Sequence, residues 1–436
     1  MREKFLKKGM IVITCLALQS LASSVEFAGG TGDPSDPYQI ATAEQLVAVG
    51  SDPNLLDRHF VLVADIDMDP DLPSGRVFTN ALAGQDEGDG VSGHSGASFT
   101  GVLDGGGHAI ANLHIEGVHG FDAGLFGKLS GLVKDLRLTD VVISGSPCGA
   151  IAGLNHRAGM ILRCEVTGRI SGFDDVGGLV GNNWDASLVE CRARVQVTGQ
   201  DNVGGMVGGG PGGTLMRCQV QGAVNGERSV GGLVGHSHRG QIVECQATGT
   251  VVGGNDVGGL IGGSDETMIW RSSADCEVTA EQTAGGLVGS ARWSSGPLIA
   301  DCYARGSVAG SVVGGLAGEA RHNQFLNCYA ACEAIPLQIE GGELLVGGLF
   351  GDVRVPAWAP LTVSCFWDAE LSRVAVSIGS DRLELGTGLT TEQMLDSGVY
   401  QNAGWDFSHV WKACEGDYPT LRWQAEDCVV EVTTPQ

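Results

Sequence analysis

Basic residues, aromatic rings and long apolar runs are scarce in this 436-residue chain, and each shortage excludes a class of protein. The 26 Lys and Arg residues stand against 51 Asp and Glu, and a net charge of −25 has the wrong sign for binding nucleic acid or an anionic membrane surface. Downstream of the N-terminus, no apolar run is long enough to cross a bilayer. Aromatic residues make up only 6 %, yet 43 % of the residues are hydrophobic, which is enough for a core and excludes wholesale disorder.

The motifs of common hydrolases are also missing. The chain has no His-Glu-x-x-His and no Gly-x-Ser-x-Gly sequence. His236 and His238 lack a third partner at the spacing of zinc ligands. We therefore expect no catalytic residue set and no resident cofactor.

The N-terminus has the pattern of a secretory signal peptide. Four basic side chains lie within residues 1–8, an apolar stretch covers residues 10–18, and Ser20-Leu21-Ala22 fits the rule of small residues at a cleavage site. We expect residues 1–22 to be removed and the mature protein to be secreted or held at the cell surface. Disulfides can form in such a compartment.

A glycine-rich pentad repeats through the middle of the chain. Five copies start 27 residues apart, at Gly177, Gly204, Gly231, Gly258 and Gly285. Two more follow at Gly314 and Gly347 after small insertions. A unit of this size cannot bury its own apolar face, but stacked units can. The glycines fit narrow coil corners and positions of positive φ, and the sequence assigns no single glycine to either.

A second pattern follows each pentad and is typical of a strand. Cysteines recur with the same period, with Ser272 in the place of one of them. The residues two before these positions, such as Met216 and Trp270, and the residues two after them are apolar or small, so we expect all three positions to face inward. The residue directly before each cysteine alternates in charge, which predicts an outward ladder of ion pairs: Arg163, Glu190, Arg217, Glu244, Arg271 and Asp301. We expect buried reduced thiols at the cysteine positions, with disulfides between coils as the alternative: Cys164, Cys191, Cys218 and Cys245.

Together these patterns predict an all-β, right-handed parallel β-helix of about ten coils. We expect the solenoid over residues 99–375 and small caps over residues 23–98 and 376–436. A capping-box pattern at Thr42 and another at Thr390 predict short helices in these caps. Cys414 and Cys428 lie outside the repeats and are candidates for a disulfide.

The pentads resemble the GLUG repeat family, named for its Gly-Leu-any-Gly core. The resemblance covers about residues 99–368, and the flanking segments Asp36–Ile40, Ala64–Asp67 and Cys365–Asp368 are similar to those that accompany such repeats in secreted bacterial proteins. It implies an exported β-helical repeat protein, and it implies no defined reaction.

Calcium is the one cation for which the sequence offers clustered oxygen ligands. Asp65, Asp67 and Asp69 alternate along a predicted strand, and acidic residues occupy the turns before the pentads. A solvated strand edge and ordinary tight turns explain the same residues, and we favour that interpretation.

The loops after the pentads are where the repeat stops repeating. Stacking would align them into one lateral ridge, and variable loops on a rigid scaffold are common binding sites. The predicted ridge residues are Trp184, Asp185, His236, His238, Arg239, Asp265, Glu266, Arg292, Trp293, Arg321 and His322.

We interpret the chain as a monomeric, non-catalytic adhesion scaffold that binds an extracellular polysaccharide or a surface protein through this ridge. Two alternatives stay open. One is a polysaccharide-active enzyme that uses Asp185, Asp265, Glu266 and Arg239, which rests on analogy with other β-helices. The other is a structural spacer that binds nothing.

Overall fold

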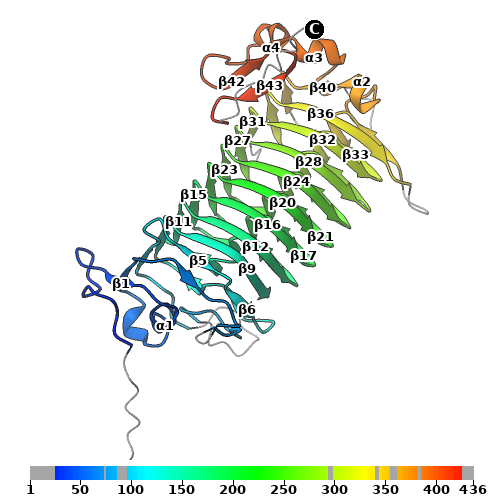
Figure 1. Cartoon of the computed structure of the whole chain (residues 1–436). Helices are drawn as coiled ribbons and strands as arrows, with labels where there is room; N and C mark the ends of the chain where they lie inside the picture. Colours follow the sequence, from blue (N-terminus) through cyan, green and yellow to red (C-terminus); the bar gives the residue numbers. More distant parts are fainter. Residues whose placement is uncertain are drawn as a thin grey trace, which may run out of the picture.

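The chain forms a parallel β-solenoid whose coils stack along one axis (Figure 1). The computed structural model describes residues 25–72, 75–85, 96–292, 298–338, 343–353, 361–380 and 384–424, so the predicted signal peptide lies outside it. Four long sheets, here named A, C, D and E, contain 12, 13, nine and seven strands. The predicted all-β, parallel solenoid is confirmed, and these strand numbers bracket the expected ten coils.

Each full coil passes through sheets E, D, A and C in turn. Sheet E contains β13 (Asp174–Gly177), β17 (Asp201–Gly204), β21 (Arg228–Gly231), β25 (Asn255–Gly258), β29 (Thr283–Gly285), β33 (Val312–Gly314) and β37 (Leu345–Gly347). Sheet D contains β7 (Phe126–Leu129), β10 (Ala152–His156), β14 (Val180–Trp184), β18 (Val207–Gly209), β22 (Val234–His238), β26 (Ile261–Asp265), β30 (Val288–Arg292), β34 (Ala317–Ala320) and β38 (Phe350–Asp352).

The other two sheets are longer because the flanking segments add strands to them. Sheet A contains β1 (Tyr38–Ile40), β2 (His59–Leu62), β4 (Val102–Asp104), β8 (Leu132–Lys134), β11 (Met160–Leu162), β15 (Ser187–Val189), β19 (Thr214–Met216), β23 (Gln241–Val243), β27 (Met268–Trp270), β31 (Leu298–Ala300), β35 (Gln324–Leu326) and β39 (Leu361–Val363). Sheet C contains β3 (Ile66–Asp67), β5 (Ala109–Ala111), β6 (His114–Glu116), β9 (Arg137–Gly145), β12 (Glu165–Gly172), β16 (Arg192–Thr198), β20 (Gln219–Asn225), β24 (Gln246–Gly253), β28 (Ser273–Ala280), β32 (Tyr303–Gly310), β36 (Tyr329–Pro336), β40 (Phe366–Asp368) and β41 (Thr387–Leu389).

Equivalent residues of successive repeats are direct neighbours in every sheet. Val176 pairs with Val203 in sheet E, and Leu188 pairs with Leu215 in sheet A. Their side chains point into one continuous apolar core that runs from Ile40 to Ile378. Stacking of equivalent positions is what turns a linear repeat into files of like residues along the rod.

The pentad glycines are explained by close backbone approach, which corrects part of our expectation. Gly177, Gly178 and Gly181 do not have a positive φ. A Cβ added at Gly177 would lie 2.0 Å from the carbonyl oxygen of Val180, and one at Gly178 would lie 2.1 Å from that of Gly205. Both distances are far inside van der Waals contact, so these positions exclude any side chain.

Positive φ falls instead on polar and charged residues at the coil corners. The corner between sheets A and C repeats it at Arg163, Glu190 and Arg217, with φ values of 51°, 55° and 53°. This left-handed residue interrupts the pleat, so the residue before it turns outward. Met216 is 37 % exposed and Trp270 is 40 % exposed, so the prediction that the residues two before the cysteine positions face inward is wrong there, while Ala300 is buried as predicted. The residues two after it, such as Val166 and Ala193, are buried as predicted.

Short helices lie in the two flanking segments. They are α1 (Ala43–Ala48), α2 (Ala369–Ser372), α3 (Thr391–Leu395) and α4 (Ser397–Asn402), with one 3₁₀ turn at Pro53–Leu55. Thr390 forms the full capping box with Gln393. Thr42 accepts from the Gln45 amide, but the Gln45 side chain bonds Ala41, so this box is half-formed.

The C-terminal segment folds against the flank of the last coils as well as extending sheet C. Its hairpin, β42 (Trp411–Cys414) and β43 (Asp417–Leu421), and the helix α4 enclose a second apolar cluster with Tyr303, Tyr329 and Phe366. The Arg305 guanidinium lies 5.0 Å from the Tyr303 ring centre and donates to the carbonyl of Tyr418 at 2.8 Å. The outward face of sheet C is thus covered at its C-terminal end.

Candidate functional site

The predicted ridge exists as a stacked corner between sheets D and A. Backbone pairing places His156, Trp184, Pro211 and His238 on four successive coils, followed by Asp265 and Arg292 on the next two. We call the first four residues the ring file. Trp184 is 45 % exposed, and its ring meets that of His156 edge-on with the centres 6.4 Å apart.

The position that follows each member of this file is left-handed, and it holds Arg157, Asp185 and Arg239 after three of the rings and Gly212 after Pro211. Asp185, Arg239, Glu266 and His322 all have a φ of 50–56°. The Arg239 guanidinium pairs with the Glu266 carboxylate at 2.8 Å. The ring file is therefore flanked along its length by polar groups.

Further along, the ridge becomes a network of ion pairs with little exposed surface. The imidazole Nε2 of His236 lies 3.1 Å from an Asp265 carboxylate oxygen. Arg292 joins two buried carboxylates, Asp256 at 2.9 Å and Glu319 at 2.7 Å, and Arg321 also pairs with Glu319. Burial raises the pKa of the Asp256 carboxyl, and Arg292 opposes this shift. Trp293, a predicted ridge residue, lies outside the described residues.

These contacts show which predicted ridge residues come together. His236 meets Asp265, Arg239 meets Glu266, and Arg292 and Arg321 share Glu319. Asp256 and Glu319 were not predicted as site residues. Asp256 comes from the turn before a pentad, so only stacking of sheet E beside sheet D brings it to Arg292.

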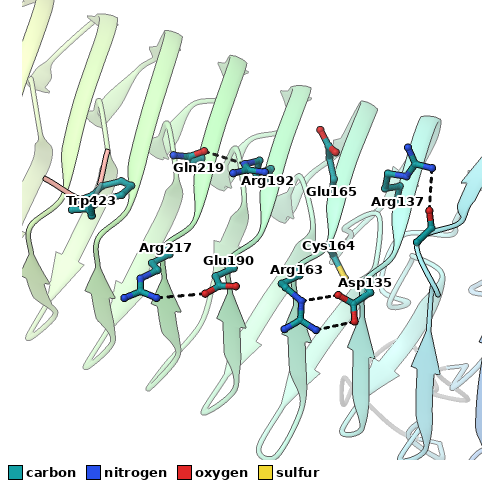
Figure 2. Close-up of a pocket in the computed structure, with 11 residues that line it drawn as sticks. Asp135, Arg137, Arg163, Cys164, Glu165, Glu190, Arg192, Arg217, Gln219 and Trp423 are labelled. Carbon is teal, nitrogen blue, oxygen red and sulfur yellow. Dashed lines mark hydrogen bonds and ion pairs between the residues drawn. The ribbon is translucent and has the colours of Figure 1, made fainter. Parts of the chain in front are cut away.

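A groove of about 560 Å³ lies elsewhere, at the corner of sheets A and C (Figure 2). Arg137, Glu165, Arg192 and Gln219 lie along it on neighbouring strands, and Trp423 of the C-terminal segment closes one end. The Trp423 indole N–H donates to the carbonyl of Arg271 at 2.7 Å. Sequence reasoning missed this groove, because Trp423 is distant in the chain and only the folded segment brings it here.

The predicted charge ladder runs along the edge of this groove. Glu190, Arg217, Glu244 and Arg271 form a continuous run of pairs, with distances of 3.5, 2.9 and 3.4 Å between successive members. Arg163 pairs instead with Asp135 of the preceding coil at 2.6 Å, and Asp301 accepts from the Trp411 indole. The ladder is confirmed in its middle part, and exposed pairs of this kind contribute little to stability because solvent and salt screen them.

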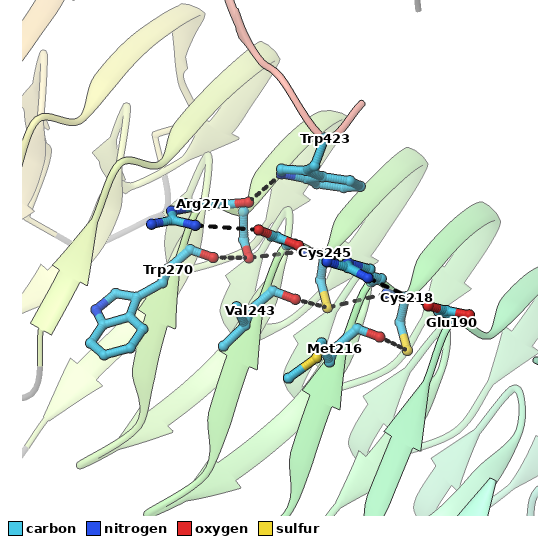
Figure 3. A network of polar contacts seen from close by, with 11 residues as sticks. Glu190, Met216, Cys218, Val243, Cys245, Trp270, Arg271 and Trp423 are labelled. Atoms are coloured by element: carbon cyan, nitrogen blue, oxygen red, sulfur yellow. Dashed lines mark hydrogen bonds and ion pairs between the residues drawn. The ribbon is translucent and has the colours of Figure 1, made fainter. Parts of the chain in front are cut away.

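The cysteine file beneath this corner consists of free thiols. Ten cysteines are free and buried, including Cys164, Cys191, Cys218 and Cys245. Cys218 donates from Sγ to the Met216 carbonyl at 3.5 Å, and Cys245 Sγ accepts from the Cys218 amide at 3.4 Å (Figure 3). Burial raises the pKa of the Cys276 thiol to about 12, so that thiol stays protonated at neutral pH. Cys414 is disulfide-bonded, and its predicted partner Cys428 lies outside the described residues.

The candidate calcium ligands are each engaged in local hydrogen bonds. Asp65 accepts from the Ala109 amide at 2.9 Å, Asp67 from the Asn112 side chain at 2.8 Å, and Asp69 from the Asp71 amide at 2.9 Å. Across the described ranges, no three His, Cys, Asp or Glu side chains are grouped as a metal site. The expectation of no resident cofactor stays a prediction, with calcium as the less favoured interpretation of these carboxylates.

Comparison with protein families agrees with the repeat pattern. The family model of the GLUG motif matches residues 226–252. The chain carries the GLUG motif. The matched GLUG segment contains β21, β22, β23 and most of β24, which is one coil of the solenoid.

Two curated proteins are similar in sequence to parts of this chain. Halomucin of Haloquadratum walsbyi is 33 % identical over 159 residues, which is 35 % of this chain and 2 % of halomucin. A candidate Gly-rich membrane protein of Evansella cellulosilytica is 34 % identical over 143 residues, which is 31 % of this chain and 15 % of that protein. The chain thus spans a small part of the length of either relative.

Among solved structures, a candidate immunoglobulin A1 protease from Bacteroides ovatus aligns over 91 % of this chain and 95 % of its own. The sequences are 19 % identical and the TM-score is 0.42. No helix among the described residues has the length and apolar character needed to cross a membrane.

Proposed function

We propose that this protein is a secreted or cell-surface scaffold that binds an extracellular polysaccharide along its lateral ridge. The single observation that carries the proposal is the ring file, in which His156, Trp184, Pro211 and His238 present rings from four successive coils. The names of its relatives, a halomucin and a membrane protein, support a location at a cell surface.

The spacing of the ring file suits a polymer. Neighbouring strands in a sheet lie about 4.8 Å apart, so four coils present rings over roughly 15 Å. The aromatic ring of Trp184 offers a flat apolar surface to the apolar face of a sugar, and a rigid row of an indole, two imidazoles and a proline ring needs little ordering when the ligand binds. Asp185 and Arg239 beside the file supply an acceptor and donors for hydroxyl groups.

The alternative of a polysaccharide-active enzyme gains no support from the same corner. Asp265 is held by His236 and Glu266 by Arg239, so two of the three candidate carboxylates already have a cationic or imidazole partner. A glycoside hydrolase needs two carboxyl groups free to face the bond between them. If the ridge binds nothing, the alternative of a purely structural spacer applies.

The test is binding of a polysaccharide panel to the full chain and to two tryptophan variants. Trp184→Ala removes the most exposed ring of the file. Trp270→Ala is the matched control, since Trp270 is similarly exposed on sheet A. We expect one or more glycans to bind and Trp184→Ala to weaken binding about tenfold or more, the size expected for losing a stacked ring. Equal binding by all three proteins, or none by the parent, would overturn the proposal.

A further inference from the structure

The outward face of sheet C carries a local excess of positive charge on a strongly acidic protein. Four exposed arginines lie on three neighbouring strands, Arg137 on β9, Arg169 on β12, and Arg192 and Arg194 on β16. We call them the arginine band. Two adjoining grooves run over them, one of about 560 Å³ beside Arg137 and Arg192, and one of about 610 Å³ beside Arg169 and Arg194.

Most of the band's hydrogen-bonding capacity is unused within the protein. Arg137 donates to the Gly107 carbonyl at 3.1 Å, and Arg192 donates to the Gln219 side chain at 3.1 Å. Arg194 has one long contact, 3.4 Å, with Glu165. Arg169 has no hydrogen-bond or ion-pair partner among the described residues. A guanidinium carries five N–H donors, so each of these side chains can still take a carboxylate or sulfate.

The neighbouring corner arginines behave differently, which sets the band apart. Arg163 is held by both oxygens of Asp135, at 2.6 and 2.8 Å, and Arg217 is held between Glu190 and Glu244. These ion pairs hold Arg163 and Arg217 at the edge of the groove. The arginine band therefore differs from the corner arginines, because its four guanidinium groups are exposed and are not each paired with a carboxylate.

We infer that the arginine band binds an anionic polysaccharide of low charge density. In the backbone register, Glu165 has Arg137 as its partner on one neighbouring strand and Arg192 on the other. The two arginines therefore occupy the same position of the repeat, two coils and roughly 10 Å apart. Figure 2 shows Arg137, Glu165 and Arg192 on three successive strands of one face. A polymer in which a uronic acid alternates with a neutral sugar would place its carboxylates on the arginines and its hydroxyl groups on Glu165.

A denser polyanion fits this surface poorly. Double-stranded DNA carries one charge about every 1.7 Å along its axis. The carboxylates Glu165, Glu190 and Asp135 lie within the same groove, and the whole chain has a net charge of −25. Both features repel a polymer whose negative charges are so closely spaced that some of them must lie beside these carboxylates.

Trp423 adds a stacking surface at the end of this groove. Its indole N–H is anchored on the Arg271 carbonyl, and it lines the groove with Arg217 and Gln219. A sugar ring that follows the band toward the C-terminal segment would meet this indole.

The test uses the full chain and hyaluronan, which carries one carboxylate per disaccharide, with neutral dextran and heparin as comparison polymers. We expect hyaluronan to bind at low salt, to weaken as salt rises, and to lose about tenfold or more in affinity in Arg137→Gln/Arg192→Gln, as for loss of charge-assisted contacts. Arg228→Gln/Arg373→Gln removes the same charge elsewhere and should change the affinity by less than about twofold. Thermal unfolding of each variant shows whether it is folded.

Three results would overturn the inference: no binding of hyaluronan, equal loss in the control variant, or preference for dextran or heparin over hyaluronan. The ridge is tested separately, because Trp184→Ala should leave hyaluronan binding by the band unchanged. Failure of one site is therefore distinguishable from failure of the other.

Discussion

At the residue scale, the repeats reverse the usual preference for glycine at left-handed backbone positions. Left-handed corners are taken by charged residues such as Arg217 and Glu244, although a side chain there costs roughly 1–2 kcal/mol. Glycines such as Gly204 occupy positions without a positive φ, because neighbouring backbone leaves no room for a Cβ. The charged corner residues offset part of their cost by pairing along the rod.

We expect the Asp175 carboxyl to lower the stability of the folded protein as pH rises. It sits at a left-handed corner and accepts from Asn182 at 3.0 Å and Asn202 at 2.9 Å. Burial raises the pKa of the Asp175 carboxyl above its usual value near 3.8, and the two hydrogen bonds oppose this shift in part. The folded state therefore holds the proton more tightly than the unfolded chain, and this carboxyl lowers stability as pH rises from about 4 through its raised pKa.

Denaturant unfolding of the parent and Asp175→Asn between pH 4 and 7 checks this. The variant has no carboxyl to ionise at this position. The difference in free energy of unfolding, variant minus parent, should therefore increase as pH rises, and altered hydrogen bonds add only a term that does not change with pH. Asp185→Asn, at an exposed left-handed corner, is the control for loss of one negative charge. A constant difference between parent and Asp175→Asn across this range would contradict the account.

At the element scale, the coil closes because backbone segments touch at the pentads. The repeat period could be read from the sequence, since equal spacing of Gly177, Gly204 and Gly231 requires equal coils. The corner geometry could not, because charged residues rarely adopt a left-handed conformation and nothing local marks Arg217 or Arg271 as a corner. An uninterrupted strand was therefore predicted, and Met216 and Trp270 were wrongly placed in the core.

Gly204→Ala should destabilise the solenoid by about 1–3 kcal/mol or more, the cost of overpacking a rigid site. Its Cβ would lie 2.0 Å from the Val207 oxygen and 2.7 Å from the Gly235 nitrogen, and both are backbone atoms. Gly398→Ala in α4 is the control, since its Cβ would approach only the Asp396 carboxylate, at 3.0 Å. Urea unfolding measures both. Similar small effects at the two sites would show that the pentad backbone is free to shift.

At the scale of the whole molecule, the solenoid displays different chemistry along each corner. The ring file follows the corner of sheets D and A, and the arginine band lies beside the corner of sheets A and C. The repeat made the first surface predictable, because stacking alone aligns Trp184 with its neighbours. The second needed the folded chain, because Arg271 and Trp423 meet only when the C-terminal segment packs on sheet C.

The most direct test of the central claim is hydroxyl-radical footprinting of the full chain with a bound polysaccharide from the panel. Trp184 and Trp270 are exposed to 45 % and 40 %, so their reactivity without ligand should be comparable. If the ring file is the binding surface, Trp184 becomes protected as the polymer is added while Trp270 keeps its reactivity. Protection of Trp270 with Trp184 still reactive would contradict the account.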